Sequence, residues 1–595
     1  MEDMKMKIYP KDSSAEAVIL CDYGKNNLFN LTRHTRIKII KKGGLSLANI
    51  QQLISTDGRL DIIKASTFNL VNGEIVETPL TNKGIFERDF NKSYKLATFT
   101  MPSVKEGSII EYIYQTTSAP LEWRFQMEVP TRLSEYWANF PNIVKVRKYM
   151  QGYVPVSEYK EIGENTAHWI LKDVPAFRKE PFMSSETDYI SKVTFVIDYI
   201  NSINAYSYFK ADFMNTWEKM NEMLPNEENF GKLITGSGFL KDLVSQITDS
   251  IKDSPLKIKA LTNYVKQNFE WDGQKEFWGS PLKKVVEKKK GSSGDLNILL
   301  ASMLDKAGFE VDMILLSTRD HGFIRKPFPS MRQLNYAICS VIVGNKVLLL
   351  DATEKYLPYD VLPSYCLNDE GLIISKKRTG WINLVPTVKD KTIIETKLDL
   401  TSEGILDGKL SYIHEGYDGM KARKEFFSKE EGAYSKKILI GSNWTVKKKE
   451  FSDMEDNSKS AKSSYEIVVD EHATTDGNVI YFNPFITPTI ENQFKASTRT
   501  YPVEFGTRIE KVCLSRIAIP DNYIVDELPK GVALVLPENS ARFIYNISQQ
   551  GNTINVTSSF LVNKSLFTQE EYPRLREFYS QVVAKQAEQI VLRRK

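Results

Sequence analysis

"EKKKGSSGDLNILLASMLDKAG", residues 287–308, joins a glycine- and serine-rich turn to an apolar helix. Apolar residues recur in this helix at three- and four-residue spacing, which predicts that it packs inside a domain. They are Leu296, Leu299, Leu300, Met303, Leu304 and Ala307. Gly291 and Gly294 permit a tight turn into the helix. The free N–H groups and the positive end of the helix dipole then face Ser293.

The start of a buried helix is where many acyl-transfer enzymes hold a nucleophile. For a cysteine, this position lowers the thiol pKa and supplies donors for an oxyanion. A serine gains less, because its hydroxyl still needs a general base. The alternative for Ser293 is a helix N-cap, since Ser292-x-x-Asp295 resembles a capping box.

"NYAICSVIVGNKVLLLDAT", residues 335–353, predicts a β-hairpin with Gly344-Asn345 as its two-residue turn. In this register Tyr336 faces Thr353, and Tyr336 shares a sheet face with Asp351. The two are diagonal neighbours at roughly 7–8 Å, so a long side chain at position 336 reaches Asp351. We therefore expect the Tyr336 hydroxyl to bond to Asp351 at the strand end.

The order of these elements resembles that of the transglutaminase-like, papain-related fold. Ser293 starts a helix, Tyr336 lies on a strand, and Asp351 closes the next strand. In that family the three positions hold Cys, His and Asp. A common first motif is G-x-C-x-D, which "GSSGD" at 291–295 matches except at Ser293. The second motif is often Asn-His, and here it reads Asn335-Tyr336. The third, Asp-x-Thr, is intact from Asp351 to Thr353.

The resemblance extends to both flanks. "MPSVKEGSIIEYIY" and "FQMEVPTRLSEYW" resemble an uncharacterised β domain that precedes transglutaminase-like domains in exported proteins of Gram-negative bacteria. "ENQFKASTRTYPVEFG" and "EEYPRLREFYSQVVAKQAEQIVL" resemble the uncharacterised domain that follows them. The resemblance implies a periplasmic or otherwise exported protein from a Gram-negative bacterium.

The predicted fold class is multidomain α+β. Residues 1–190 are expected to form a β-sandwich-like domain, with a hairpin turn at Asn72-Gly73. Residues 196–375 are expected to form the transglutaminase-like domain, with helices first and an antiparallel sheet afterwards. Residues 385–595 are predicted to be β-rich and to end in a helix whose apolar face docks on the strands. Within them, 452–464 is expected to be a mobile polar loop.

Composition excludes several classes of protein. The chain has 595 residues, with 79 basic and 75 acidic ones, so we expect no bulk electrostatic binding of nucleic acid. The four cysteines form no CxxC pair and the five histidines no HxxxH or HxH pattern, so neither a metal nor another cofactor is expected. Cys339 points away from Tyr336 and is predicted to be a core thiol. No apolar run approaches the roughly 20 residues of a membrane span.

The functional prediction depends on Ser293, which stands where the family has cysteine, and on Tyr336, which stands where it has histidine. Tyrosine has a pKa near 10, so Tyr336 is a poor general base, and without a base Ser293 should be inert. His321, on a loop, is the remaining candidate base. The favoured hypothesis is a pseudoenzyme with a degenerate triad of Ser293, Tyr336 and Asp351.

Such a pseudoenzyme would bind a peptide, a glycan or another cell-envelope component in the old cleft. The residues expected to line this cleft are Trp278, Asn335, Tyr336 and Ser293. Two alternatives stay open. One is a hydrolase or acyltransferase that uses Ser293 with an unrecognised base. The other is a structural spacer whose cleft is filled core.

Overall fold

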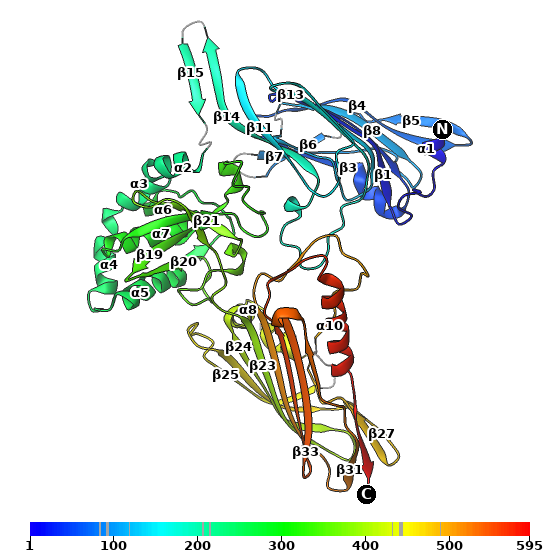
Figure 1. Cartoon of the computed structure of the whole chain (residues 1–595), viewed down its shortest axis with the longest axis vertical. Coiled ribbons are helices and arrows are strands. Elements are labelled where there is room, and N and C mark those ends of the chain that lie inside the picture. The colour runs from blue at the N-terminus through cyan, green and yellow to red at the C-terminus, as the bar shows by residue number, and fades with distance from the viewer. Residues whose placement is uncertain are drawn as a thin grey trace. The chain divides into compact units, whose positions relative to one another are not determined.

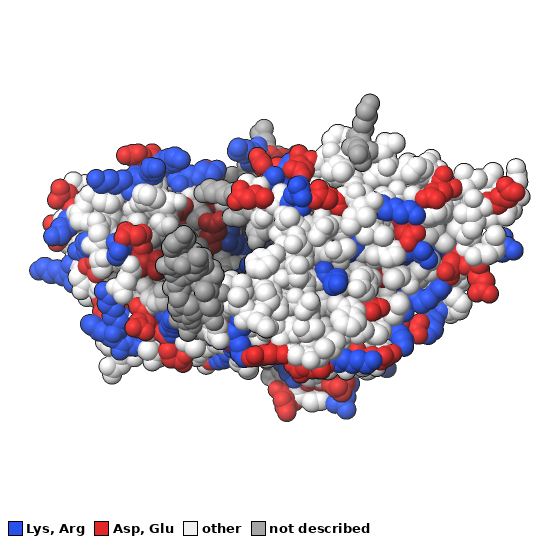
Figure 2. Space-filling view, turned by 90° about the horizontal axis from the view of Figure 1, so that it is seen from above, with Lys and Arg blue, Asp and Glu red and all other residues white. Residues whose placement is uncertain are grey.

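The structure is a computed structural model, shown in Figure 1. It describes residues 1–81, 85–90, 94–117, 120–204, 207–212, 216–430, 432–439, 444–487 and 490–595. The chain forms two compact units. The first consists of residues 1–179, 185–219 and 325–331, and the second of residues 180–184, 220–324 and 332–595. Basic and acidic side chains are interspersed on the face shown in Figure 2, in keeping with the nearly balanced charge.

The first unit is built on an eight-stranded sheet. In sheet order its strands are β12 (Glu158–Gly163), β13 (Thr166–Val174), β10 (Thr131–Asn139), β1 (Ala17–Asn26), β2 (Leu31–Ile39), β8 (Ile109–Thr116), β4 (Leu60–Val71) and β5 (Glu74–Pro79). The hairpin predicted at Asn72-Gly73 joins β4 to β5, and both turn residues have positive φ, as a tight primed turn requires.

Two smaller sheets complete this unit. One contains β3 (Asn49–Ser55), β7 (Tyr94–Thr100) and β6 (Ile85–Asp89). The other contains β9 (Glu122–Arg124), β11 (Val144–Gln151), β14 (Lys192–Asn204) and β15 (Ser207–Asp212). Each shares an apolar core with the large sheet, so the unit is sandwich-like, as predicted. Strand β14 runs across residue 196, the predicted start of the central domain.

The central part of the second unit has helices followed by a sheet. The helices are α3 (Gly231–Thr235), α4 (Lys241–Thr248), α5 (Ser254–Asn268), α6 (Leu282–Lys288) and α7 (Ser293–Lys306). The sheet runs β20 (Lys346–Leu350), β19 (Tyr336–Val343), β18 (Val311–Leu316), β21 (Glu370–Ile374) and β22 (Trp381–Asn383). All four pairings are antiparallel, and α7 packs on β19 and β18. This is the predicted α+β arrangement.

The C-terminal part of the second unit is β-rich. Its eight-stranded sheet runs β25 (Trp444–Ser452), β26 (Ala461–Val469), β24 (Leu406–Glu415), β23 (Asp390–Leu400), β30 (Ile509–Ala518), β34 (Thr553–Val562), β33 (Ala541–Gln550) and β32 (Val532–Val535). A four-stranded sheet runs β27 (Ala473–Asp476), β28 (Val479–Phe482), β36 (Ile590–Arg594) and β31 (Tyr523–Glu527). Two short helices, α8 (Gly416–Phe426) and α9 (Ala433–Ile438), follow β24.

The last helix, α10 (Tyr572–Gln586), docks on the large sheet as predicted. Its apolar face is buried through Leu575, Phe578, Tyr579 and Val582. Gln586 interrupts this face in sequence but is itself buried. Its amide donates to Ser558 Oγ at 3.0 Å and accepts from the Ile490 N–H at 2.9 Å, so the polar group is satisfied inside the core.

The polar stretch 452–464 is mostly strand. β25 takes one end and β26 the other, so the loop is only residues 453–460. Arg423 of α8 is buried beneath it. Its guanidinium donates to the carbonyls of Asp453, Met454, Asp456 and Lys459. In the described part of the chain, each helix is too short or too polar to cross a membrane.

Candidate functional site

The start of α7 is held by a capping box around Ser292. The Asp295 N–H donates to Ser292 Oγ at 3.2 Å, and the Ser292 N–H donates to Asp295 Oδ2 at 3.0 Å. The predicted capping box is therefore confirmed, and Ser292 is the N-cap. Gly294 faces the preceding loop so closely that a Cβ atom there would lie 2.2 Å from the Trp278 carbonyl oxygen.

Ser293 lies one residue inside the helix and has no exposed surface. Its hydroxyl donates to the Glu276 carbonyl at 2.7 Å and accepts from the Glu276 N–H at 2.8 Å. Its own N–H donates to the Gln274 carbonyl at 3.0 Å. Ser293 is thus not the N-cap itself. Its hydroxyl and its N–H both bond to the backbone of the segment that covers it.

The β19–β20 hairpin has the predicted register. Val343 pairs with Lys346, and the pairing continues to Cys339 with Leu350. The Tyr336 hydroxyl donates to Asp351 Oδ2 at 2.8 Å and lies 2.8 Å from Thr353 Oγ1. Tyr336 and Asp351 are both fully buried. The predicted bond between them is confirmed.

Asp351 has further donors that the sequence analysis missed. Asn297 Nδ2 donates to Oδ2 at 3.0 Å, while the N–H and hydroxyl of Thr353 donate to Oδ1 at 2.9 and 2.6 Å. Asn297 also accepts from the Ala352 N–H at 2.8 Å. It lies four residues after Ser293, on the same face of α7. A single asparagine among the apolar residues of this helix was the signal that could have identified it.

Tyr365 completes the cluster and was also missed. It lies in the short helical turn Ser364–Cys366, and its hydroxyl is 2.8 Å from Thr353 Oγ1 and 3.4 Å from the Tyr336 hydroxyl. Burial, followed by the charge of Asp351, raises the pKa of Tyr336 well above its ordinary value. The phenol is therefore a hydrogen-bond donor to the carboxylate and not a base. No motif in the sequence connects position 365 to the hairpin.

The residues predicted to line a cleft differ in exposure. Ser293 and Tyr336 have no exposed surface, so a ligand could touch them only after the covering segments move. Trp278 and Asn335 are half-buried. The Trp278 ring packs 4.8 Å from that of Phe277, and the Asn335 amide bonds to the N–H and hydroxyl of Thr318. A ligand-binding cleft lined by these four residues therefore remains a prediction.

Cys339 and His321 were also considered in the sequence analysis, as a core thiol and as a candidate base. The Cys339 thiol is fully buried and lies 2.9 Å from the Asn297 carbonyl, as expected for a core thiol. His321 Nδ1 lies 2.9 Å from Ser317 Oγ. Among the residues that the structure describes, no three His, Cys, Asp or Glu side chains are grouped so that they could hold a metal ion.

Three family models match the chain. A transglutaminase-like superfamily model matches residues 241–337, which include positions 293 and 336 but not Asp351. A domain of unknown function with a solved structure, DUF3857, matches residues 25–178. A second, DUF3858, matches residues 478–592. No curated protein matches the sequence.

A solved structure shares the fold over nearly the whole chain. A crystal structure from Parabacteroides distasonis, named as that of a "putative protease", is 12% identical in sequence. It superposes with a TM-score of 0.63 and covers 97% of this chain and 99% of that chain. A "putative cysteine protease" from Cytophaga hutchinsonii is 11% identical over 51% of this chain and 75% of that chain, with a TM-score of 0.17. The likeness to the first structure is one of fold. The family models therefore identify a transglutaminase-like core at residues 241–337, flanked by segments that match the DUF3857 and DUF3858 models.

Proposed function

We propose that this protein is a non-catalytic member of the transglutaminase-like superfamily that acts by binding rather than by acyl transfer. The observation that carries the proposal is the state of Ser293. Its hydroxyl is fully buried, donates to one backbone carbonyl and accepts from one backbone N–H. A nucleophile must reach a substrate and give its proton to a base, and this hydroxyl is positioned for neither step.

The position of the base supports the same proposal. Tyr336 occupies the place of the histidine, and its hydroxyl proton is directed at Asp351. A histidine base would take a proton on one ring nitrogen while the aspartate held the other. The Tyr336 hydroxyl donates its proton to Asp351, and the neutral phenol oxygen is too weak a base to take a proton from Ser293. The aspartate consequently acts as a buried hydrogen-bond acceptor.

The alternative of a hydrolase using Ser293 would require the loop at Gln274–Glu276 to withdraw. The alternative of a spacer would need no concave surface. The second unit has a cavity of about 730 Å³ that is lined largely by apolar side chains, among them Val347, Leu349 and Val385. A cavity of this size is within the range of ligand sites, which favours a binding role over a spacer.

We also propose that the protein acts outside the cytoplasm, in the cell envelope. Support comes from the flanking domains, which resemble those of exported transglutaminase-like proteins, and from the match to both of their family models. Cell fractionation with an antibody to the protein tests this. Recovery with cytoplasmic markers alone would contradict it.

An acyl-transfer assay tests the loss of catalysis. Wild type, Ser293→Ala and the double variant Ser293→Cys/Tyr336→His are incubated with peptide and amine substrates, and intact mass reports any covalent adduct. Ser302→Ala, another buried serine of α7, is the matched control. We expect no turnover and no adduct from wild type. Turnover that Ser293→Ala abolishes and Ser302→Ala retains would overturn the proposal.

A further inference from the structure

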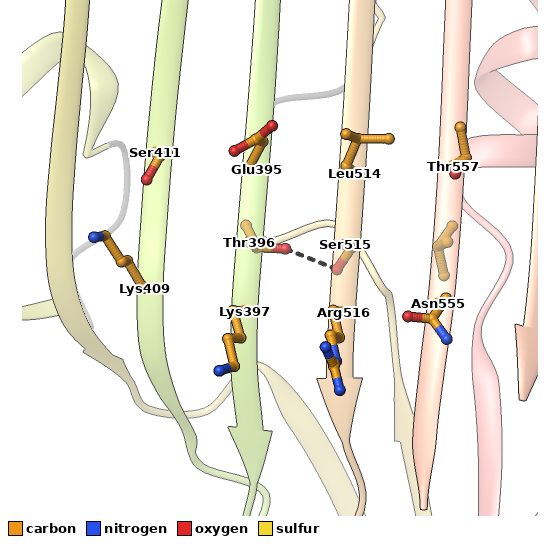
Figure 3. Close-up of a pocket in the computed structure, with 11 residues that line it drawn as sticks. Glu395, Thr396, Lys397, Lys409, Ser411, Leu514, Ser515, Arg516, Asn555 and Thr557 are labelled. Atoms are coloured by element: carbon orange, nitrogen blue, oxygen red, sulfur yellow. Dashed lines mark hydrogen bonds between the residues drawn. The ribbon is translucent and has the colours of Figure 1, made fainter. Parts of the chain in front are cut away.

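The outer face of the C-terminal sheet has a shallow depression of about 440 Å³. It lies over four neighbouring strands, β24, β23, β30 and β34, as Figure 3 shows. The opposite face of these strands packs on the apolar core. Among the lining residues on the outer face, only Leu514 is apolar, because Val556 belongs to the core on the opposite face.

Three cations lie in one row across this depression. Lys409 of β24 pairs with Lys397 of β23, which pairs with Arg516 of β30. All three side chains are exposed on the same face (Figure 3). Strands lie about 4.8 Å apart, so the row covers roughly 10 Å. Lys397 therefore has a cation directly opposite it on each side, a pairing that destabilises a sheet.

Nearby carboxylates compensate the row only in part. Lys409 lies opposite Glu466 on its other side. Lys397 is followed and preceded along its own strand, on the same face, by Asp399 and Glu395. Within the described ranges, however, Lys397, Lys409 and Arg516 form no ion pair, since each is more than 4 Å from the nearest carboxylate oxygen. The like-charged row is thus a cost to stability that the fold does not require, which is typical of a functional site.

The chemistry around the row indicates what it would bind. Glu395 lies beside the cations, together with the hydroxyls of Ser411 and Thr557 and the amide of Asn555. A ligand that fills the depression must present an anionic group to the cations and hydroxyl donors to the carboxylate and amide. An acidic sugar has both. An acidic peptide offers the anion, but its carboxylates would meet Glu395.

The strands also disfavour recognition through a peptide backbone. All four are internal to the sheet, so their N–H and C=O groups already pair with neighbours. A peptide cannot add to them as an extra strand, and recognition has to go through side chains. We propose that this row, Lys409–Lys397–Arg516, is a binding site for an acidic saccharide. The proposal gives a place and a ligand class to the binding role proposed above and in that sense rests on it.

Calorimetric titration of the full chain tests this site. The probes are tetragalacturonate, a sulfated disaccharide, neutral maltotetraose and tetraglutamate. We expect one or both acidic saccharides to bind, more weakly as salt rises, and maltotetraose not to bind. Lys397→Gln/Arg516→Gln should weaken binding at least about tenfold, because two charge-assisted contacts are lost. Lys436→Gln, on α9 and in an exposed ion pair with Glu430, is the matched control and should stay within about twofold of wild type.

The titration tests the saccharide site, and the acyl-transfer assay tests the loss of catalysis. Either proposal can therefore be contradicted while the other stands. Absence of binding by both acidic saccharides overturns the site. So does equal affinity in wild type and the double variant, or tetraglutamate binding as tightly as the saccharides. Thermal melting checks the fold. The double variant removes like-charged neighbours, so it should melt no lower than wild type. If it melts lower, the single variants Lys397→Gln and Arg516→Gln are titrated instead, and each must weaken binding several-fold.

Discussion

The Tyr336 hydroxyl donates to Asp351 Oδ2 at 2.8 Å, from the first residue of β19 to the residue after β20. Asn297 of α7 donates to the same oxygen at 3.0 Å. One buried carboxylate therefore joins the central helix to both strands of the hairpin. In the family that the chain resembles, the corresponding aspartate serves a histidine. Here it accepts hydrogen bonds from Tyr336, Asn297 and Thr353, and removing one of these donors should lower stability.

Tyr336→Phe tests this structural role. The substitution removes one donor from a buried carboxylate, so we expect a loss of about 1–3 kcal/mol in the free energy of unfolding. Urea denaturation of the purified protein measures it. Tyr545→Phe is the matched control, because its hydroxyl is buried and finds no hydrogen-bond partner among the described residues. That control should be neutral or stabilising. Equal effects of the two substitutions would contradict the role of Tyr336.

Gly294→Ala tests the tight start of α7. An alanine Cβ would lie 2.2 Å from the Trp278 carbonyl oxygen, and this backbone atom cannot move without displacing the loop over Ser293. We expect a loss of at least about 1–3 kcal/mol in unfolding free energy. Gly238 has no atom within 4 Å of an added Cβ. Gly238→Ala should therefore be neutral or stabilise by about 0.4–1 kcal/mol. A harmless Gly294→Ala would show that the loop yields.

Much of this site could be predicted from the sequence because short-range rules determine it. A two-residue turn at Gly344-Asn345 fixes the hairpin register, and the register places Tyr336 beside Asp351. The capping box follows from the spacing of Ser292 and Asp295. Both features depend on residues that are close in sequence or joined by one turn.

The remaining partners come from segments whose position only tertiary packing determines. Glu276 covers Ser293 through its backbone, which carries no sequence signal. Tyr365 reaches Thr353 from a turn that no periodic pattern marks. The predicted mobile loop at 452–464 was too long, because the alternating pattern of β26 begins inside a run of polar residues. Burial of Ser293 could therefore not be inferred from the motif around it.

Lys266 predicts a pH dependence of stability. Its amine is fully buried and donates to the carbonyls of Leu357 and Pro358 at 3.1 Å. Burial lowers its pKa to about 8, although the charge of Asp351 acts in the opposite direction. Between about pH 8 and pH 10.5 the unfolded chain keeps a proton that the folded protein has lost, so stability rises with pH in this window.

Lys266→Met should remove that rise. Relative to the variant, wild type should gain up to about 3 kcal/mol of unfolding free energy as the pH increases through the window. Urea denaturation at several pH values measures the difference. Lys257→Met, on the same helix α5, is the matched control and should keep the wild-type slope. Parallel pH profiles of wild type and Lys266→Met would contradict the prediction.

Arg423→Lys tests how the loop at 453–460 is held. The guanidinium donates from Nε and Nη2 to four carbonyls of this loop, at 2.7–3.1 Å, and only 2% of the residue is exposed. Lysine keeps the charge, but its single nitrogen cannot reproduce the planar fork, so carbonyls are left without donors. We expect a loss of about 1–3 kcal/mol in stability and faster amide hydrogen exchange confined to the loop and the adjoining ends of β25 and β26. Arg593→Lys changes an exposed ion pair with Asp526 and should alter neither measurement. Unchanged exchange in Arg423→Lys would mean that the strands alone hold the loop.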